Sequence, residues 1–388
     1  MSDQPIEERI LSAIQTALSG IDGRVPLHEP HFSGNESAYV QDCLDSSFVS
    51  SIGKYVDRFE HMLAEYTGVQ RAVAVVNGTS ALHAALTIAG VGQNDEVLVP
   101  ALTFVATANA VTYTGAVPHF VDCEEKTLGV DPLKLENYLK KVTRKGVDGC
   151  ENKFSGRRIR AIVATHIFGH PVDLDPIEAL CRRFGLVLIE DAAEAIGSFY
   201  KGSHVGNRGF LSVLSFNGNK TITTGGGGAI LANDEALGDL AKHITTTAKV
   251  PHPWAYIHDR VGYNYRMPDI NAALGCGQME QLPSFIYKKR ALAHRYAEAF
   301  SDVQGVRFFK EPEFADSNYW LNAILLDDSV QGYREDVLEL TNQNGIMTRP
   351  VWTLMHKLSM FRECPSMDLA TSESIERRLI NIPSSPML

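Results

Sequence analysis

The sequence lacks the long apolar runs, the paired cysteines and the basic bias that mark several large classes of protein. No uninterrupted apolar stretch in its 388 residues is long enough to cross a bilayer. The net charge of -10 argues against non-specific binding to nucleic acid or to an anionic membrane. The six cysteines form no Cys-x-x-Cys pair, so zinc and redox sites of that kind are not expected. The acidic N-terminus is atypical of a secretory signal, and we expect a cytoplasmic protein with reduced thiols.

From about residue 72, short apolar runs alternate with longer segments of helical periodicity. This alternation predicts an α/β fold, in which a mainly parallel sheet is covered by helices on both faces. The predicted strands are residues 72–76, 96–99, 118–121, 161–164, 186–190, 212–215 and 229–231. The predicted helices between the first five strands are residues 80–88, 106–112, 132–141 and 176–184.

The pattern changes on either side of this region. The first 20 residues show helical spacing, and the polar, glycine-containing segment 144–160 is interpreted as an inserted surface loop. After Pro268 the sequence predicts a helix to about residue 281, a break at Pro283 and a long charged helix over 286–300. The remainder predicts a smaller α+β domain, with strands at 318–325 and 346–350 and a helix at 334–344.

Lys220 stands where a merely solubilising lysine is unusual. It follows the apolar run 211–214 and precedes the four glycines 225–228, so it leaves a buried strand and meets a glycine-rich turn. Burial disfavours the ammonium form of a lysine and lowers its pKa. A neutral amine can attack an aldehyde, so Lys220 predicts a Schiff base to a cofactor.

Two other strand ends offer groups that a planar, phosphorylated cofactor would need. Gly78, Thr79 and Ser80 open a helix after the first strand, and the free N–H groups there would suit a phosphate. Ordinary N-capping by Thr or Ser is the alternative. Phe104 follows the second strand and could lie on a planar ring, although a phenylalanine in the core is the alternative.

Two strands that precede the Lys220 turn add a carboxylate and two donors. Asp191 ends a buried strand, where it could hold a ring nitrogen protonated or could cap the next helix. Ser215 and Asn217 lie two residues apart, so the period of a strand places both on one face, where they could donate to one anion. Each feature alone is weak, but together they supply what pyridoxal phosphate requires.

Other ligand classes fit the sequence poorly. Asn219 occupies the position directly before the lysine, at which a nucleotide-binding phosphate loop requires glycine. No Gly-x-Gly-x-x-Gly follows the first strand, and the serine-hydrolase pattern Gly-x-Ser-x-Gly is missing. His166 and His170 have helical spacing but no third ligand in view, so we expect no metal.

Five motifs at these strand ends carry a resemblance to a known family. They are NGTSAL at 77–82, PALTFVAT at 100–107, EDAAE at 190–194, SFNGNK at 215–220 with TTG at 223–225, and GYNYRM at 262–267. With them the chain resembles the DegT/DnrJ/StrS family of nucleotide-sugar aminotransferases over nearly its whole length. A narrower likeness is to the LegC-type branch. It rests on LHEP at 27–30, FVSSIG at 48–53, YVDRFE at 55–60, the four-glycine run, and TRPVWTLMHK at 348–357.

The resemblance implies the aspartate aminotransferase-like fold, fold type I, and a homodimer with shared active sites. It implies a helical segment with a strand bordering the substrate cleft at 1–50, a large pyridoxal phosphate-binding domain at 51–268, and a small C-terminal domain at 269–388. Lys220 matches the Schiff-base lysine, Asp191 the partner of the pyridine nitrogen, Glu194 a residue near the ring hydroxyl, and Phe104 the ring-stacking aromatic. The remaining matches are Gly78, Thr79, Ser80, Ser215 and Asn217 around the phosphate, Asn264 reaching it from the neighbouring subunit, and Ser50 and Ser51 beside the substrate cleft.

The implied activity is transfer of an amino group from L-glutamate to a nucleotide-linked 4-keto-6-deoxy sugar. The LegC likeness points to a UDP-4-keto-6-deoxy-N-acetylhexosamine, on a route to sugars of surface polysaccharides such as lipopolysaccharide. One alternative is sugar dehydration, which relatives with histidine in place of the lysine perform, so Lys220 favours transamination. The other alternative is a non-catalytic regulatory protein that binds pyridoxal phosphate.

Overall fold

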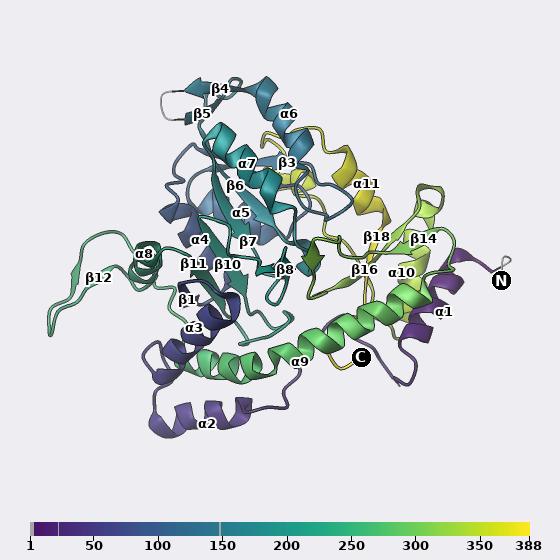
Figure 1. Cartoon of the computed structure of the whole chain (residues 1–388), viewed down its shortest axis with the longest axis horizontal. Coiled ribbons are helices and arrows are strands. Elements are labelled where there is room, and N and C mark those ends of the chain that lie inside the picture. The colour runs from purple at the N-terminus through teal and green to yellow at the C-terminus, as the bar shows by residue number, and fades with distance from the viewer. Residues whose placement is uncertain (1–3, 22, 147–148) are drawn as a thin grey trace.

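A computed structural model describes residues 4–21, 23–146 and 149–388. A seven-stranded sheet forms its centre, as Figure 1 shows. Only β11 runs antiparallel to its neighbours among these strands, so the mainly parallel sheet predicted from the sequence is confirmed. In order across the sheet, the strands are β1 (Arg71–Val75), β11 (Gly228–Ala232), β10 (Leu211–Ser215), β7 (Val187–Asp191), β6 (Ile159–Thr165), β2 (Glu96–Pro100) and β3 (Val117–Val121).

Helices flank this sheet in two groups (Figure 1). One group consists of α4 (Gly78–Ile88), α5 (Val105–Tyr113) and α8 (Glu235–Thr245), in which α4 packs on the other two. The second contains α6 (Pro132–Val142) and α7 (Leu174–Phe184), which pack on each other. Because both faces are covered, the central strands are almost wholly buried, which explains their continuous apolar runs.

The C-terminal part builds a second, smaller sheet. Its strands, in order, are β14 (Val306–Phe308), β16 (Asn322–Leu326), β18 (Leu379–Ile382) and β17 (Arg349–Pro350), with α10 (Arg334–Gln343) and α11 (Ala370–Arg378) beside them. The N-terminal helix α1 (Ile6–Ala17) joins this part, because its Ile10 and Ile14 lie in one apolar cluster with Tyr296 and Ile324. The division of the chain at residues 50 and 268 stays a prediction.

A single helix, α9 (Asp269–Ala299), replaces the two helices predicted on either side of Pro283. A proline inside a helix removes one hydrogen bond and costs about 3 kcal/mol. Packing offsets this cost, since α2 (Glu36–Ser46) and α3 (Lys54–Thr67) lie against α9 and so does α1. The prediction of a break was therefore wrong, because the tertiary contacts outweigh the local preference.

The segment 144–160 was also predicted incorrectly. Instead of a loop, its described residues form a hairpin of β4 (Thr143–Gly146) and β5 (Gly149–Asn152), followed by the start of β6, while residues 147 and 148 lie outside the described part. Two of its polar side chains face inward: Asn152 Nδ2 and Ser155 Oγ donate to the buried carboxylate of Glu96 over 2.9 and 2.5 Å. Polar side chains of this segment thus donate hydrogen bonds to a buried carboxylate, and others face the solvent.

The two C-terminal strands are shorter than predicted. Residues 318–325 become β16 only from Asn322, because Tyr319 takes the left-handed conformation with φ of 47° and interrupts the strand. Residues 346–350 contribute only the two residues of β17. Small strand pairs complete the fold: β8 (Phe199–Tyr200) with β9 (Ser203–His204) and β15 (Ala315–Asp316), and β12 (Lys249–Val250) with β13 (Ile257–His258). Within the described ranges, no helix has the length and apolar character needed to cross a bilayer.

Candidate active site

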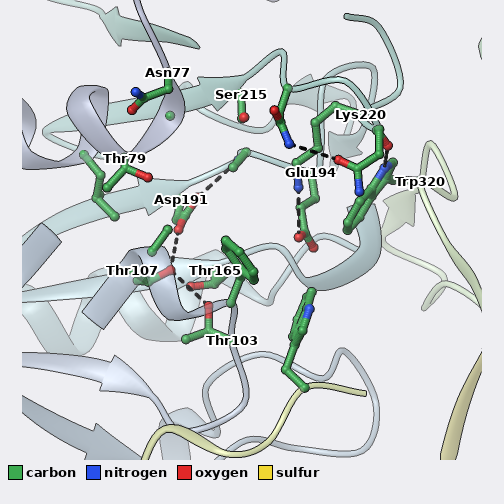
Figure 2. A pocket seen from close by; sticks show the side chains of 18 residues that line it. Asn77, Thr79, Thr103, Thr107, Thr165, Asp191, Glu194, Ser215, Lys220 and Trp320 are labelled. Atoms are coloured by element: carbon green, nitrogen blue, oxygen red, sulfur yellow. Dashed lines mark hydrogen bonds and ion pairs between the residues drawn. The ribbon is translucent and has the colours of Figure 1, made fainter. Parts of the chain in front are cut away.

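A cavity of about 310 Å³ opens at the carboxyl ends of β6, β7 and β10 (Figure 2). This is where ligands of parallel α/β sheets bind. Eight of the residues singled out from the sequence line it, namely Gly78, Thr79, Phe104, Asp191, Glu194, Ser215, Asn217 and Lys220. The strands thus bring together residues that are as many as 142 positions apart in the chain (220 − 78).

Lys220 lies inside this cavity with a side chain that is only 12% exposed. Its Nζ is 3.1 Å from Glu194 Oε1 and 3.7 Å from the centroid of the Trp320 ring. The ring is fixed in turn, because Trp320 Nε1 donates to the carbonyl of Asn219 over 2.7 Å. The carboxylate and the ring face hold the amine at one position.

Glu194 is buried and belongs to the turn that follows β7. Burial raises the pKa of Glu194, and the charge of Lys220 and the backbone N–H of Phe168 offset this only in part. That N–H donates to Glu194 Oε2 over 2.8 Å, so both carboxylate oxygens have partners. A buried carboxyl group of raised pKa, next to an amine, is suited to exchange a proton with it.

Asp191 ends β7 with both carboxylate oxygens engaged. Thr107 Oγ1 donates to Oδ2 over 2.8 Å, and the backbone N–H of Ala193 donates to Oδ1 over 3.2 Å. Thr103 Oγ1 lies 3.0 Å from Thr107 Oγ1, so the hydroxyls form a short chain that ends at the carboxylate, as Figure 2 shows. These donors hold the carboxylate in one orientation, in which it could accept a hydrogen bond from a protonated ring nitrogen.

The start of α4 forms a close-packed cradle beside Ser215. Asn77 caps the helix, with its Oδ1 accepting from the N–H of Ser80 over 2.7 Å, so the cap is Asn77 and not Thr79 or Ser80. A Cβ atom at Gly78 would lie 2.9 Å from Ser215 Cβ, and one at Gly228 would lie 2.5 Å from the carbonyl carbon of Asn77. Both glycines are therefore required for the helix start to approach the strand ends. The N–H groups in the first turn of a helix suit an anion such as a phosphate.

Four predicted residues do not line the cavity within the described part of this chain. Ser80 serves the helix cap. Ser50 is exposed, and its carbonyl accepts from the N–H of Asp269 over 2.5 Å, at the start of α9, while Ser51 is half-buried. Asn264 is exposed and accepts from Arg266 Nε over 3.0 Å. Their roles stay predictions.

The cavity also contains residues that sequence reasoning missed. Trp320 and Trp352 come from the C-terminal part, and Trp352 lies 6.1 Å from Phe104 and 5.1 Å from Phe168, measured between ring centroids. Trp320 belongs to none of the motifs described above, and the motif at 348–357 contains Trp352 without indicating a place in the cavity, since each tryptophan enters the cavity only because of the tertiary fold. Thr103 and Thr107 could have been found, because they lie four positions apart in the sequence with Phe104 between them.

Thr165 provides a direct test of whether the cavity suits a polar ligand. It ends β6 beside Asp191, is 4% exposed and lines the cavity, and its Oγ1 has no hydrogen-bond partner among the residues that the structure describes. A buried hydroxyl without a partner costs free energy unless a ligand completes it. The donor set thus fits a planar ring that carries a phosphate, an aldehyde and a basic nitrogen. No group of three His, Cys, Asp or Glu side chains in the described ranges could hold a metal ion.

Comparison with known proteins agrees with this interpretation. The profile of the DegT/DnrJ/EryC1/StrS aminotransferase family matches residues 30–388. A GDP-perosamine synthase of Escherichia coli O157:H7 is 40% identical over 94% of both chains. EpsN of Bacillus subtilis (strain 168), whose name describes a pyridoxal phosphate-dependent aminotransferase, is 37% identical over 87% of this chain and 84% of its own. The crystal structure of the aminotransferase TlmJ from Streptoalloteichus hindustanus superimposes with a TM-score of 0.85 at 27% identity, covering 94% of this chain and 95% of TlmJ. The aspartate aminotransferase-like fold expected from the sequence is confirmed.

Proposed function

Because this chain belongs to the DegT/DnrJ/EryC1/StrS aminotransferase family and uses pyridoxal phosphate to aminate nucleotide sugars, we propose that it transfers an amino group from L-glutamate to a nucleotide-linked 4-keto-6-deoxy sugar. One observation carries this proposal. Lys220 and Asp191 line the same cavity, with the hydroxyl of Thr165 unpartnered between the strand ends. A cavity with no role beyond structure would not need a buried amine, a buried carboxylate and a hydroxyl without a hydrogen-bond partner together.

Each side chain has a role that follows from its position. Lys220 Nζ would hold the cofactor through its aldehyde, and once the amine of the amino donor has displaced it, the freed Nζ would take a proton from the α-carbon of that donor. Asp191 would keep a proton on the ring nitrogen, and Phe104 would cover one face of the ring. When bound, the cofactor supplies an electron-poor ring that stabilises negative charge at the adjacent carbon.

The remaining groups would bind the phosphate of the cofactor, accept the proton of Lys220 or exclude water. The first turn of α4, with Gly78 and Thr79, binds the phosphate together with Ser215 and Asn217. Glu194 receives the proton that Lys220 must lose before it can attack, since the two groups are 3.1 Å apart and burial raises the pKa of Glu194. Trp320 and Trp352 restrict the entrance and exclude water from the amine.

The nucleotide is the finer part of the proposal. The LegC-type motifs favour a UDP-linked N-acetylhexosamine, for an amino sugar of a surface glycan. The similarity to GDP-perosamine synthases favours a GDP-linked sugar as the second candidate. Both candidates leave the roles of Lys220 and Asp191 unchanged, because the amino transfer takes place at the cofactor and not at the nucleotide.

We also propose a homodimer in which Asn264 completes the phosphate site of the partner. Asn264 is exposed and does not line the cavity described in its own chain. The neighbouring hairpin of β12 and β13 projects from the body of the protein (Figure 1). It exposes Trp254 and Tyr256, each 82% exposed, and Val261 beyond it is 85% exposed. Such large exposed apolar side chains mark a surface that a partner covers.

The first experiment tests the cofactor linkage. Purified protein with pyridoxal phosphate should show a visible absorption band that borohydride bleaches, and mass spectrometry should then find the cofactor on Lys220. Lys220→Ala should fold but lose turnover. Lys140→Ala, which changes an exposed lysine paired with Glu136, should keep full turnover. Full activity of Lys220→Ala would end the assignment.

The second experiment separates the function classes. Mixing with L-glutamate should convert the cofactor to its amine form, whereas a protein that only senses ligands would leave the spectrum unchanged. A panel of UDP- and GDP-linked 4-keto-6-deoxy sugars should then give an amino product by mass for one nucleotide. A dehydrated product would instead establish the dehydratase.

The third experiment tests the shared site. Lys220→Ala and Asn264→Ala variants should each be impaired, and mixing them after mild dissociation should restore activity. Random pairing gives mixed dimers in about half of the population, each with one intact site, so recovery should reach about a quarter of the wild-type value. Absence of recovery in a mixture that does form mixed dimers would refute the contribution of Asn264.

A further inference from the structure

The hydroxyl chain behind Asp191 has a fixed direction. Thr107 Oγ1 is 2.8 Å from Asp191 Oδ2, and a carboxylate can only accept, so Thr107 donates its single hydroxyl proton there. The Thr103 hydroxyl, 3.0 Å from Thr107 Oγ1, must then donate to Thr107. The two hydroxyls are therefore polarised in series toward the carboxylate. The dashed lines in Figure 2 mark the two hydrogen bonds.

This chain lies in a site that water does not screen. Thr103 and Thr107 are each 1% exposed, and Asp191 is 7% exposed. The charged groups that face this site are Glu194, whose charge interacts with that of Asp191, and Lys220, which is paired with Glu194. Since no cation contacts Asp191 within the described residues, the Thr107 hydroxyl and the Ala193 N–H are its local stabilisation.

We propose that Thr107, supported by Thr103, is a positioning residue that keeps the shared proton on the ring nitrogen of the bound cofactor and off Asp191. A donor to the carboxylate lowers its affinity for a proton, so the proton resides on the nitrogen. The inference rests on the proposed role of Asp191 as the partner of that nitrogen.

The same short segment also places the ring. Phe104 stands between the two threonines at the start of α5 and faces the cavity, 51% exposed, while the threonines face the carboxylate. One turn of backbone therefore fixes both the face of the ring and the orientation of its nitrogen partner. This arrangement explains why two buried hydroxyls lie four residues apart on either side of an exposed aromatic side chain.

The test uses the holoenzyme loaded with pyridoxal phosphate labelled with ¹⁵N in the ring. In the wild type, the ¹⁵N chemical shift should correspond to a protonated ring nitrogen. Thr107→Val, which keeps the shape and removes the donor, should move the shift toward that of neutral pyridine. A hydrogen bond to a charged group supports a change of about tenfold in the ratio of protonated to neutral ring nitrogen. Thr107→Ser should restore the wild-type shift.

Two further variants keep the test decisive. Thr103→Val should move the shift in the same direction but less, and it provides the readout if Thr107→Val fails to fold. Thr112→Val is the matched control, because Thr112 is exposed on the same helix and its hydroxyl donates to the carbonyl of Asn109 over 2.7 Å. Its shift should equal that of the wild type.

The outcomes separate this inference from the proposed function. A wild type that fails to bind the cofactor, or that shows a neutral ring nitrogen, contradicts the role of Asp191 itself. A protonated wild-type ring with an unchanged shift in Thr107→Val and Thr103→Val overturns the inference and leaves the aminotransferase proposal standing. A purely structural role for Thr107 would lower stability in both Val and Ser variants without moving the ¹⁵N shift.

Discussion

Glu190, the residue before Asp191, allows a stability prediction whose size can be worked from the structure. Its carboxylate is fully buried at the end of β7. It accepts several hydrogen bonds from the turn that leads into β10. Its partners are the N–H groups of Gly206, Arg208 and Gly209 at 2.8, 2.7 and 2.6 Å, the hydroxyl of Ser212 at 3.3 Å, and His166 Nε2 at 3.1 Å.

The shift in the pKa of the Glu190 carboxyl indicates how much its hydrogen-bond partners contribute to the free energy of unfolding. Burial alone would raise it, but His166 and the backbone donors outweigh burial and lower the pKa of Glu190 from 4.5 to about 2. At about 1.4 kcal/mol per pH unit, ionised Glu190 contributes about 3 kcal/mol to the free energy of unfolding at pH 7. Because the folded pKa is depressed, this contribution is present above pH 4.5 and is lost as the pH falls toward 2.

Glu190→Gln is the perturbation, since it keeps the shape but replaces one acceptor by a donor that faces other donors. We expect it to lower the free energy of unfolding by about 3 kcal/mol at pH 7, measured by urea denaturation followed by fluorescence. The difference from wild type should shrink between pH 5 and pH 3. Glu136→Gln, which changes a half-buried carboxylate on α6 paired with Lys140, should change little at either pH. An equal loss at pH 7 and pH 3 would refute the electrostatic reasoning.

Three more changes test separate parts of the structure. Gly78→Ala should weaken cofactor binding about tenfold or more, because its Cβ would lie 2.9 Å from that of Ser215, whereas Gly92→Ala, which adds a Cβ in open space, should not; equal titration curves would contradict the cradle. Thr165→Val should raise the dissociation constant of the cofactor without lowering the melting temperature of the cofactor-free protein, and an unchanged constant would show that its hydroxyl binds no ligand. Burial lowers the pKa of Lys289 well below its ordinary value, so the unfolded chain holds a proton that the folded chain releases. Wild type should therefore gain stability relative to Lys289→Met as the pH rises from 7 toward 10, and parallel pH profiles would contradict this.

Local periodicity determined much of the fold in advance. The strands of the central sheet are short runs of buried apolar residues, and their alternation with helical patterns reports a mainly parallel sheet, because period and burial are properties of adjacent residues. Local periodicity could not predict that α9 continues through Pro283, since the contacts that offset the cost of the proline come from α1, α2 and α3. It also missed the hairpin within 144–160, where polar side chains serve a buried partner.

The sequence alone singled out Lys220 and Asp191, two charged residues that line the proposed active site. Lys220 after a buried strand and Asp191 at the end of another are anomalies in burial and charge, and such anomalies can be read one segment at a time. Only the tertiary structure decided what surrounds them: the tryptophans at 320 and 352, the unpartnered hydroxyl of Thr165, and the direction of the Thr103 to Thr107 hydrogen bond. These depend on distances between residues that are remote in the chain, and such distances are set by how the helices and sheets pack, which no local pattern encodes.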